Sequence, residues 1–441
     1  MPVYERRLDG SPLANVMRLC LLQLTMPRSA VDGEIVEALL ALGLVSADGG
    51  NVRPRARILP VDDLLLAFDG FARGADDPIG YVAPFTPTAS WLASLTPRRR
   101  GVSALDVGTG NGVHALLAAR HHEHVIATDV NPRALAFTEI NAALNGITNV
   151  ETRLGSLFEP VAGERFDLIT CNAPYVVSPE SRWQYRDGGL PADEFSRHVV
   201  ESAARSLADD GYASVLVSWV ASAEDEPDER LDEWLDGSGC DAWVIALEGA
   251  DPLEHAAGWN EHLADDPAAY GAALDEWTAY FDRIGVGWIS EGAVLLHRRE
   301  GVTHSIRLDS AEADDLERAS AQILRAFAAQ ARLAELERPE RLLDEKVRLA
   351  REVRVDYILE PHVREGNTVL TLEEGTHAEY ELDPDVAEVV KQLDGTRTLA
   401  RAVERVVRTF ELDKRETAEL RRDTLEEIED LLALGIAELV A

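Results

Sequence analysis

Apolar and polar positions divide the chain into a helical start, a centre in which strands and helices alternate, and a mixed end rich in helices. In the centre, short apolar runs bounded by turn residues predict buried strands, and apolar positions three and four residues apart predict the helices that cover them. Such alternation is typical of an α/β sheet that is covered on both faces. The predicted strands are 104–107, 124–128, 150–153, 166–171, 211–219, 241–248 and 286–299. The predicted helices are 112–121, 132–145 and 191–208, followed by a helical insertion over 251–283.

The same pattern predicts three domains. Residues 79–308 form the central α/β domain, and residues 1–78 and 309–441 form smaller units on either side of it. Apolar positions over 13–24 and 29–45 predict two helices, and the glycine-rich turn that follows them predicts a hairpin. Two helices and a hairpin outline a winged-helix-like module at the start of the chain.

Three arginines of this first module, Arg53, Arg55 and Arg57, stand two residues apart and would share one face of a strand. One interpretation is a wing that contacts a polyanion or an acidic tail. The other is a solvated edge strand, a position that Pro54 tolerates because an edge strand does not need every N–H.

The last domain begins with a long amphipathic pattern over 310–336, for which Ser310 is the expected N-cap. Extended segments are expected at 352–359, 367–372 and 378–382, and three helices are expected within 381–439. This α+β arrangement predicts a second winged-helix-like domain. The junction Leu-Asp-Gly-Thr-Arg-Thr at 393–398 resembles small winged-helix peptide-recognition modules of peptide-modifying systems, but a dimerisation domain or a structural cap has the same pattern.

The stretch from residue 104 to residue 119, ALDVGTGNGVHALLAA, joins a buried strand to a helix through a glycine-rich turn. Asp106 lies at the end of the strand, and Gly108, Gly110 and Gly112 form the turn. Glycine is needed where a ligand lies directly against the main chain and where the backbone takes an unusual conformation. The stretch therefore predicts a cofactor site at this turn.

Two acidic residues favour S-adenosylmethionine over a dinucleotide as that cofactor. A dinucleotide fingerprint would place a third glycine at Val113 and a pyrophosphate on the turn, where the carboxylate of Asp106 would repel it. The cationic amino-acid end of S-adenosylmethionine suits the same carboxylate. Asp129 follows the next strand, 23 residues after Asp106, which is near the interval at which a carboxylate binds ribose hydroxyls.

The apolar strand FDLITC at 166–171 runs directly into the motif Asn-Ala-Pro-Tyr at 172–175. Here the sequence resembles the class I methyltransferases that carry an (Asp/Asn)-Pro-Pro-Tyr motif after the fourth strand. Members of that family methylate exocyclic amino groups of bases or the glutamine amide of peptide-chain release factors, and this sequence resembles the actinobacterial release-factor type. The resemblance extends over roughly residues 80–300 and implies five parallel strands followed by an antiparallel pair.

The resemblance also implies roles for the motif. Asn172 and the main-chain carbonyl of Ala173 would accept hydrogen bonds from the target NH2 group, and Tyr175 would stack on its plane. An amide or aromatic amine nitrogen is a poor nucleophile because its lone pair is delocalised, and two acceptors on its hydrogens localise that pair and aim it at a methyl carbon. Two positions depart from the family: Ala173 replaces the first proline, and Ser156 stands where relatives often carry Asp toward the adenine.

These motifs give two sets of candidate site residues. The predicted catalytic residues are Asn172, Ala173, Pro174 and Tyr175. The predicted cofactor-binding residues are Asp106, Gly108, Thr109, Gly110, Gly112, Asp129, Val130, Ser156, Leu157 and Asn172. No metal site is expected, because the three cysteines are widely separated.

Three other segments are candidates to shape the pocket. Phe85 and Thr86 precede the glycine turn, and either they line the pocket or they serve structural packing. The loop 177–190 is expected to cover the substrate, and its candidate contacts are Trp183, Tyr185, Arg186 and Asp187. In the helical insertion, the aromatic residues are expected in the core more than at a ligand: Trp259, Trp277 and Tyr280.

The net charge of −36 bears on the partner. Residues 1–100 hold 11 arginines and 11 acidic residues, so the whole excess falls on residues 101–441. Because phosphate contacts need clustered arginine and lysine, this charge disfavours nucleic acid unless one patch is locally basic. A protein or a small molecule is the favoured partner. Neither a signal peptide nor a membrane-spanning run is expected, and the separated cysteines indicate reduced thiols in the cytoplasm, with Cys171 as a buried strand residue.

The sequence thus predicts a cytoplasmic, S-adenosylmethionine-dependent N-methyltransferase that acts on a planar amide or amino nitrogen. A glutamine-type nitrogen of a protein or peptide is the favoured acceptor. The alternatives are an RNA or DNA exocyclic-amine methyltransferase, a small-molecule tailoring methyltransferase, and a non-catalytic binding module that kept the fold. The oligomeric state does not follow from the sequence.

Overall fold

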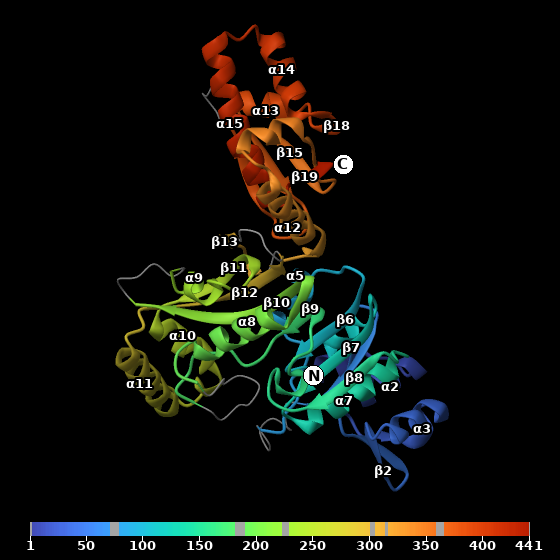
Figure 1. Cartoon of the computed structure of the whole chain (residues 1–441). Coiled ribbons are helices and arrows are strands. Elements are labelled where there is room, and N and C mark those ends of the chain that lie inside the picture. The colour runs from blue at the N-terminus through green and yellow to red at the C-terminus, as the bar shows by residue number, and fades with distance from the viewer. Residues whose placement is uncertain are drawn as a thin grey trace.

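An eight-stranded sheet forms the centre of the molecule (Figure 1). The computed structural model describes residues 2–70, 79–180, 190–222, 229–299, 305–313, 316–358 and 366–440. The strands of the sheet are β6 (Gly101–Val107), β7 (His122–Asp129), β8 (Val150–Leu154), β9 (Phe166–Cys171), β10 (Leu207–Ala221), β11 (Cys240–Ala250), β12 (Trp288–Arg298) and β13 (Ile306–Ser310). Each strand predicted between residues 104 and 299 is present, so the periodicity of that region is confirmed.

The strand order is β13-β11-β12-β10-β9-β6-β7-β8. Strands β8, β7, β6, β9 and β10 are parallel, and β12 runs antiparallel between β10 and β11. This arrangement of five parallel strands and an antiparallel pair is the one that the resemblance implied, and the Rossmann-like α/β class is confirmed. The edge strand β13 was not predicted, and it places Ser310 opposite Ala246 in a parallel ladder.

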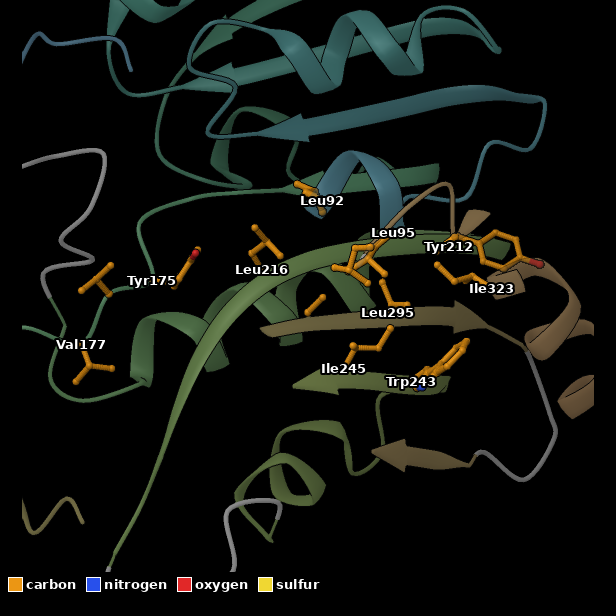
Figure 2. Packing of buried hydrophobic residues seen from close by; sticks show 14 of the residues in the cluster. Leu92, Leu95, Tyr175, Val177, Tyr212, Leu216, Trp243, Ile245, Leu295 and Ile323 are labelled. Carbon is orange, nitrogen blue, oxygen red and sulfur yellow. The ribbon is translucent and has the colours of Figure 1, made fainter. Parts of the chain in front are cut away.

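Helices cover both faces of the sheet because successive side chains of each strand point to opposite faces. One face packs against α5 (Pro87–Leu95), α6 (Val113–Ala118), α10 (Pro252–Trp259), α11 (Pro267–Ile284) and α12 (Ser320–Glu335). The other face packs against α8 (Glu194–Ser206) and α9 (Glu229–Leu235). Figure 2 shows Leu92 and Leu95 of α5 in the same buried cluster as Leu216 and Leu295 of the sheet. The sheet is therefore a rigid platform for the loops at its ends.

The N-terminal residues build a small unit that packs on α7 (Pro132–Leu144). Its elements are α1 (Pro2–Arg7), α2 (Pro12–Cys20), β1 (Met26–Pro27), η1 (Arg28–Ala30), α3 (Gly33–Ala41), β2 (Val45–Asp48) and β3 (Asn51–Pro54), and the strands pair in the order β1-β3-β2. Val36 and Val52 share one buried cluster with Phe137 of α7. A second hairpin, β4 (Arg57–Val61) and β5 (Leu64–Phe68), follows. The winged-helix assignment of this unit stays a prediction.

The expectation that three arginines share one strand is wrong. Strand β3 ends at Pro54, and β4 begins only at Arg57, so Arg53 and Arg57 belong to different hairpins. The physical reason is Pro54, which has no N–H to continue a ladder. Arg53 also donates to Asp48 across the hairpin at 3.0 Å, which partly neutralises it.

The C-terminal residues form a separate α+β unit, drawn in orange and red at the top of Figure 1. Its elements after α12 are η5 (Pro339–Asp344), β14 (Lys346–Leu349), β15 (Val353–Ile358), β16 (Asn367–Leu372), β17 (Glu379–Leu382), α13 (Pro384–Val390), β18 (Asp394–Thr398), α14 (Leu399–Phe410), α15 (Lys414–Ala433) and β19 (Ala437–Val440). The strands form two sheets, β18-β14-β19 and β15-β16-β17. The second winged-helix assignment also stays a prediction.

Helix α12 connects this unit to the central domain. Ile323 and Phe327 of α12 belong to the core beneath the large sheet, whereas Ala329 belongs to the core of the C-terminal unit. The prediction that this helix begins after an N-cap at Ser310 is wrong, because Ser310 is the last residue of β13 and the helix begins at Ser320. The amphipathic pattern holds from Ser320 to Glu335, but the helix does not extend back to Ser310.

Candidate active site

A cavity of about 540 Å³ lies at the carboxyl ends of the parallel strands, where ligands bind in open α/β sheets. The loops after β6, β7, β8 and β9 supply much of its wall, and residues 79–89 supply more. The predicted site residues on the wall are Gly108, Thr109, Gly110, Asp129, Val130, Ser156, Leu157, Asn172, Ala173, Pro174 and Tyr175. Asp106 and Gly112 do not line the cavity. The structure therefore brings together most of the residues that the two sequence motifs indicated.

The glycine turn packs closely against its neighbours. Gly108 has a φ of +66°, and a Cβ at this position would lie 3.3 Å from the Cβ of Ala173 in the loop after β9. Gly112 has a φ of +84°, and a Cβ there would lie 2.9 Å from the side chain of Thr138 on α7. A larger residue at Gly108 would push the turn away from the loop after β9, which begins with Asn172 and is called the reaction loop below. A larger residue at Gly112 would push the turn away from α7.

Asp106 organises the turn from behind the wall. Its carboxylate is buried and accepts hydrogen bonds from the hydroxyl of Thr109 at 2.6 Å, the hydroxyl of Thr170 at 2.8 Å and the N–H of Ala115 at 3.1 Å. Burial raises the pKa of Asp106 to about 6, and these hydrogen bonds oppose the rise. The sequence prediction placed Asp106 against the cofactor, but Thr109, which Asp106 holds, is the residue on the wall.

Asp129 lies on the wall and keeps free acceptor capacity. One carboxylate oxygen accepts from the N–H of Gly110 at 3.0 Å, and the other accepts from the N–H of Asn131 at 2.8 Å. Burial is the largest cause of a raised pKa at Asp129, and the charge of Asp106 adds to it. Because a carboxylate offers about four lone-pair positions, about two remain for ligand hydroxyls.

Two asparagines that the sequence reasoning did not single out connect the parts of the cofactor side. The buried Asn141 of α7 donates to the carbonyls of Asn111 at 2.7 Å and Ala67 at 2.9 Å, and it accepts from the N–H of Ala67. Asn111 in turn donates to the carbonyl of Ala83 at 3.1 Å. The glycine turn, β5 and the segment before α5 are thus joined by side-chain amides. A polar residue on the buried face of a predicted helix was the signal for Asn141.

The reaction loop after β9 differs from the glycine turn. Asn172 is half-buried on the wall, and its side-chain amide has no hydrogen-bond partner among the residues that the structure describes. Tyr175 is 9% exposed and interacts with Thr88 of α5. Burial, followed by the charges of Glu291 and Glu248, raises the pKa of Tyr175 well above its usual value, so the phenol is neutral.

Trp259 is the contribution of the helical insertion to the cavity wall. Its indole N–H donates to Glu291 of β12 at 3.2 Å, and burial raises the pKa of that carboxyl to about 7. His255 lies 3.1 Å from the carbonyl of Val177 and 3.7 Å from Glu291. The contact of His255 with Val177 ties the insertion to the loop after β9.

The remaining sequence predictions have mixed outcomes. Thr86 lines the cavity as expected, whereas Phe85 packs instead with the buried cluster of β5 and α6. The expectation of a core position is confirmed for Trp277 and Tyr280, whereas Trp259 is partly buried against the same core and also lines the cavity. The four loop contacts predicted before α8 lie outside the described residues: Trp183, Tyr185, Arg186 and Asp187.

Cys171 is fully buried at the end of β9, and burial raises its pKa to about 12, so the prediction of a structural rather than a nucleophilic cysteine is confirmed. Within the described ranges, no group of three or more His, Cys, Asp or Glu side chains is arranged to hold a metal ion. Of the helices that the structure describes, none combines the length and the apolar character that crossing a membrane requires.

Residues 98–238 match the family described as a methyltransferase domain. The chain carries a methyltransferase domain. This domain contains the glycine turn, Asp129 and the loop that begins at Asn172, and the enzyme class predicted from these motifs is confirmed. S-adenosylmethionine is the methyl donor that such a domain implies.

The methyltransferase domain is similar to curated proteins that are named for glutamine methylation. It is 32% identical over 138 residues to the release factor glutamine methyltransferase of Aquifex aeolicus, across 28% of this chain and 48% of that protein. It is 31% identical over 164 residues to the ribosomal protein uL3 glutamine methyltransferase of Bradyrhizobium diazoefficiens, across 33% of this chain and 50% of that protein. The chain thus spans about half the length of these relatives. The solved structure of Trm5b from Pyrococcus abyssi aligns with 57% of this chain and 62% of its own, at 16% identity and a TM-score of 0.33.

Proposed function

We propose that this chain transfers a methyl group from S-adenosylmethionine to a planar amide nitrogen of the glutamine type in a protein or peptide. The observation that carries this proposal is the side chain of Asn172, which faces the cavity without a hydrogen-bond partner among the described residues. A carboxamide acceptor brings two N–H donors that need such acceptors. It also has a flat surface, which suits the rings of Tyr175 and Trp259 on the same wall.

The cofactor side of the cavity fits S-adenosylmethionine. The volume of about 540 Å³ lies within the range of roughly 300–1,000 Å³ that is common for small-molecule sites. Asp129 has free lone pairs for the ribose hydroxyls, and the glycine turn lets a ligand approach the main chain at Gly108 and Gly110. When bound, the cofactor supplies an electrophilic methyl group on a sulfonium.

The residues of the reaction loop position the acceptor. The Oδ1 atom of Asn172 and the carbonyl of Ala173 accept the two N–H groups of the target amide, which localises its nitrogen lone pair. Asp129 and the glycine turn would hold S-adenosylmethionine, which would supply the methyl group to this nitrogen and be left as a neutral thioether, and the acceptor amide would lose one proton to solvent. Tyr175 remains neutral, because burial raises its pKa, and it therefore covers the amide plane without adding a charge.

Two further observations support a protein acceptor. Two relatives that match this domain are named for glutamine methylation, one of a release factor and one of ribosomal protein uL3. The net charge of −36 favours a neutral or basic partner over a polyanion in the active site. A cytoplasmic location, where translation proteins are made, belongs to the same proposal.

Transfer of labelled methyl from S-adenosylmethionine into an extract of the source cell tests this function. The extract is divided after the reaction and treated with protease or with nuclease, and a third part is filtered to recover small molecules. The proposal expects the label in large molecules to be lost to protease alone. Loss to nuclease alone would instead indicate a base amine, and label in the filtrate would indicate a tailoring enzyme.

A further inference from the structure

Helix α14 (Leu399–Phe410) exposes a row of arginines on one face, far along the chain from the methyltransferase domain. A shallow groove of about 480 Å³ runs along this face and is lined by Arg397, Arg401, Arg405, Arg408 and Thr409. Residues three and four apart lie on the same side of a helix, so the row follows from the sequence spacing once the helix is placed. The opposite side of α14 is buried in the C-terminal core through Leu399, Ala402, Val403 and Val406.

Three of these guanidinium groups form no ion pair with a carboxylate among the described residues. Among the described residues, Arg401, Arg405 and Arg408 have no carboxylate within 4 Å, and Arg408 donates only to the main-chain carbonyl of Glu404 at 3.2 Å. Arg397 is different, because it pairs with Asp394 at 2.8 Å. Many other arginines of the C-terminal part pair with carboxylates: Arg332, Arg341, Arg348, Arg354, Arg415 and Arg422. In a chain with a net charge of −36, a row of three unpaired arginines stands out.

We infer that this row, the α14 arginine row, binds the sugar–phosphate backbone of a nucleic acid. Arginine and threonine are common donors to phosphate oxygens. With a rise of about 1.5 Å per residue, Arg401 and Arg405 stand about 6 Å apart along the helix, so the charges form a line rather than a point. An acidic protein surface fits less well, because protein interfaces centre on buried apolar or aromatic residues and the groove is lined by arginine and threonine alone.

The net acidity of the chain does not prevent this contact. At physiological ionic strength, charges more than about 8–10 Å apart are largely screened, so the local row decides the interaction. Nucleic-acid binding was disfavoured from the sequence only in the absence of a locally basic patch. Arg53 and Arg57 of the first module lie on different hairpins and form no common face, whereas the arginines of α14 form such a patch.

Fluorescence anisotropy of the full chain with a labelled 20-nucleotide RNA and a labelled 20-base-pair DNA tests this inference. About three phosphate contacts predict that the logarithm of the affinity falls with the logarithm of salt concentration, with a slope of roughly −2 for the single strand and −3 for the duplex. The variant Arg401→Gln/Arg405→Gln/Arg408→Gln is expected to lose at least about tenfold in affinity and most of the slope. The substituted residues are exposed, so circular dichroism should be unchanged.

A control variant changes the net charge equally. Arg28→Gln/Arg53→Gln/Arg55→Gln removes three arginines from the N-terminal unit and is expected to bind as tightly as the wild type. Absence of binding at 50 mM salt, or an equal loss in both variants, would overturn the inference. A poly-glutamate competitor that displaces the RNA at equal charge concentration would show that the row binds an acidic protein instead. None of these results depends on methyl transfer, so the inference stands or falls separately from the proposed function.

Discussion

Strands β6 and β9 are neighbours in the sheet, but the polar side chains at their carboxyl ends differ in how many hydrogen bonds they make within the protein. At the end of β6, the carboxylate of Asp106 accepts three hydrogen bonds from within the domain, and in the loop that follows, Asn111 is held by Asn141 and by the carbonyl of Ala83. In the loop after β9, the amide of Asn172 has no partner among the described residues. A fixed cofactor side and an acceptor side with free hydrogen-bonding capacity are what a transfer reaction needs, because the cofactor is constant and the acceptor amide must supply its own donors.

The strongest test of this contrast is Asn172→Ala. Because the variant removes an acceptor that acts on the reacting nitrogen, we expect kcat to fall by about 100- to 1,000-fold, comparable to the loss of one preorganised donor at other active sites. Affinity for S-adenosylmethionine, measured by calorimetry, should change little. Asn172→Asp keeps an acceptor oxygen and serves as the conservative control, with partial activity expected. An Ala variant with full turnover would remove Asn172 from the mechanism.

Asp106→Asn tests the cofactor side, where the polar groups are already hydrogen-bonded within the protein. The pKa of the buried carboxyl is about 6 in the fold, against 3.8 for an ordinary Asp, so between these values the folded wild type binds more protons than the unfolded chain. The free energy of unfolding of the wild type should therefore fall relative to the variant as pH rises from 4 to 7, by about 2 kcal/mol. Urea unfolding of both proteins across this range measures the difference, and a flat difference would mean that Asp106 does not titrate as a buried group.

Asp129→Ala tests a carboxylate that lines the cavity, in contrast to Asp106, which supports the wall from behind. The variant should weaken binding of S-adenosylmethionine by about 1–3 kcal/mol, because ribose hydroxyls would lose their acceptor. Calorimetry with S-adenosylhomocysteine should show the same loss, since that product keeps the ribose. Glu151→Ala, an equal loss of charge at an exposed position of β8, is the control. Unchanged affinity in the Asp129 variant would place the ribose elsewhere.

Trp259→Leu is expected to have the smallest effect and to act on the acceptor alone. Loss of one aromatic surface should raise the KM for the acceptor by about 3- to 10-fold, whereas kcat and cofactor affinity stay close to the wild type. Trp288→Leu changes a half-exposed tryptophan of β12 that does not line the cavity and serves as the control. A lower affinity for S-adenosylmethionine in the Trp259 variant would move this residue to the cofactor side.

Much of the central fold followed from sequence because its signals are local. Both ends of strand Phe166–Cys171 were predicted correctly, because a short apolar run bounded by turn residues is typical of a buried strand. Gly108, Asp129 and Asn172 were brought to one cavity by a general rule, because the carboxyl ends of parallel strands share one edge.

Contacts between distant segments could not be predicted from the local pattern. The position of Trp259 depends on Glu291, 32 residues later, and nothing in the local pattern distinguishes Trp259 from the buried Trp277. The two arginine groups show a further limit, which is the exact start and end of each element. A spacing of two residues predicted one face for Arg53 and Arg57, but the strand ends at Pro54. The arginine row on α14 could be recognised only when the bounds of that helix were known.

The most direct test of the proposed function is to locate the transferred methyl group by mass spectrometry. Protein acceptors labelled by the wild-type chain are digested and sequenced by fragmentation, alongside a reaction with Asn172→Ala. We expect one methyl group on the side-chain amide nitrogen of a glutamine, present with the wild type and lost with the variant. A methyl group on a carboxylate oxygen, a lysine amine or a nucleic-acid base, or one that persists in the variant, would contradict it.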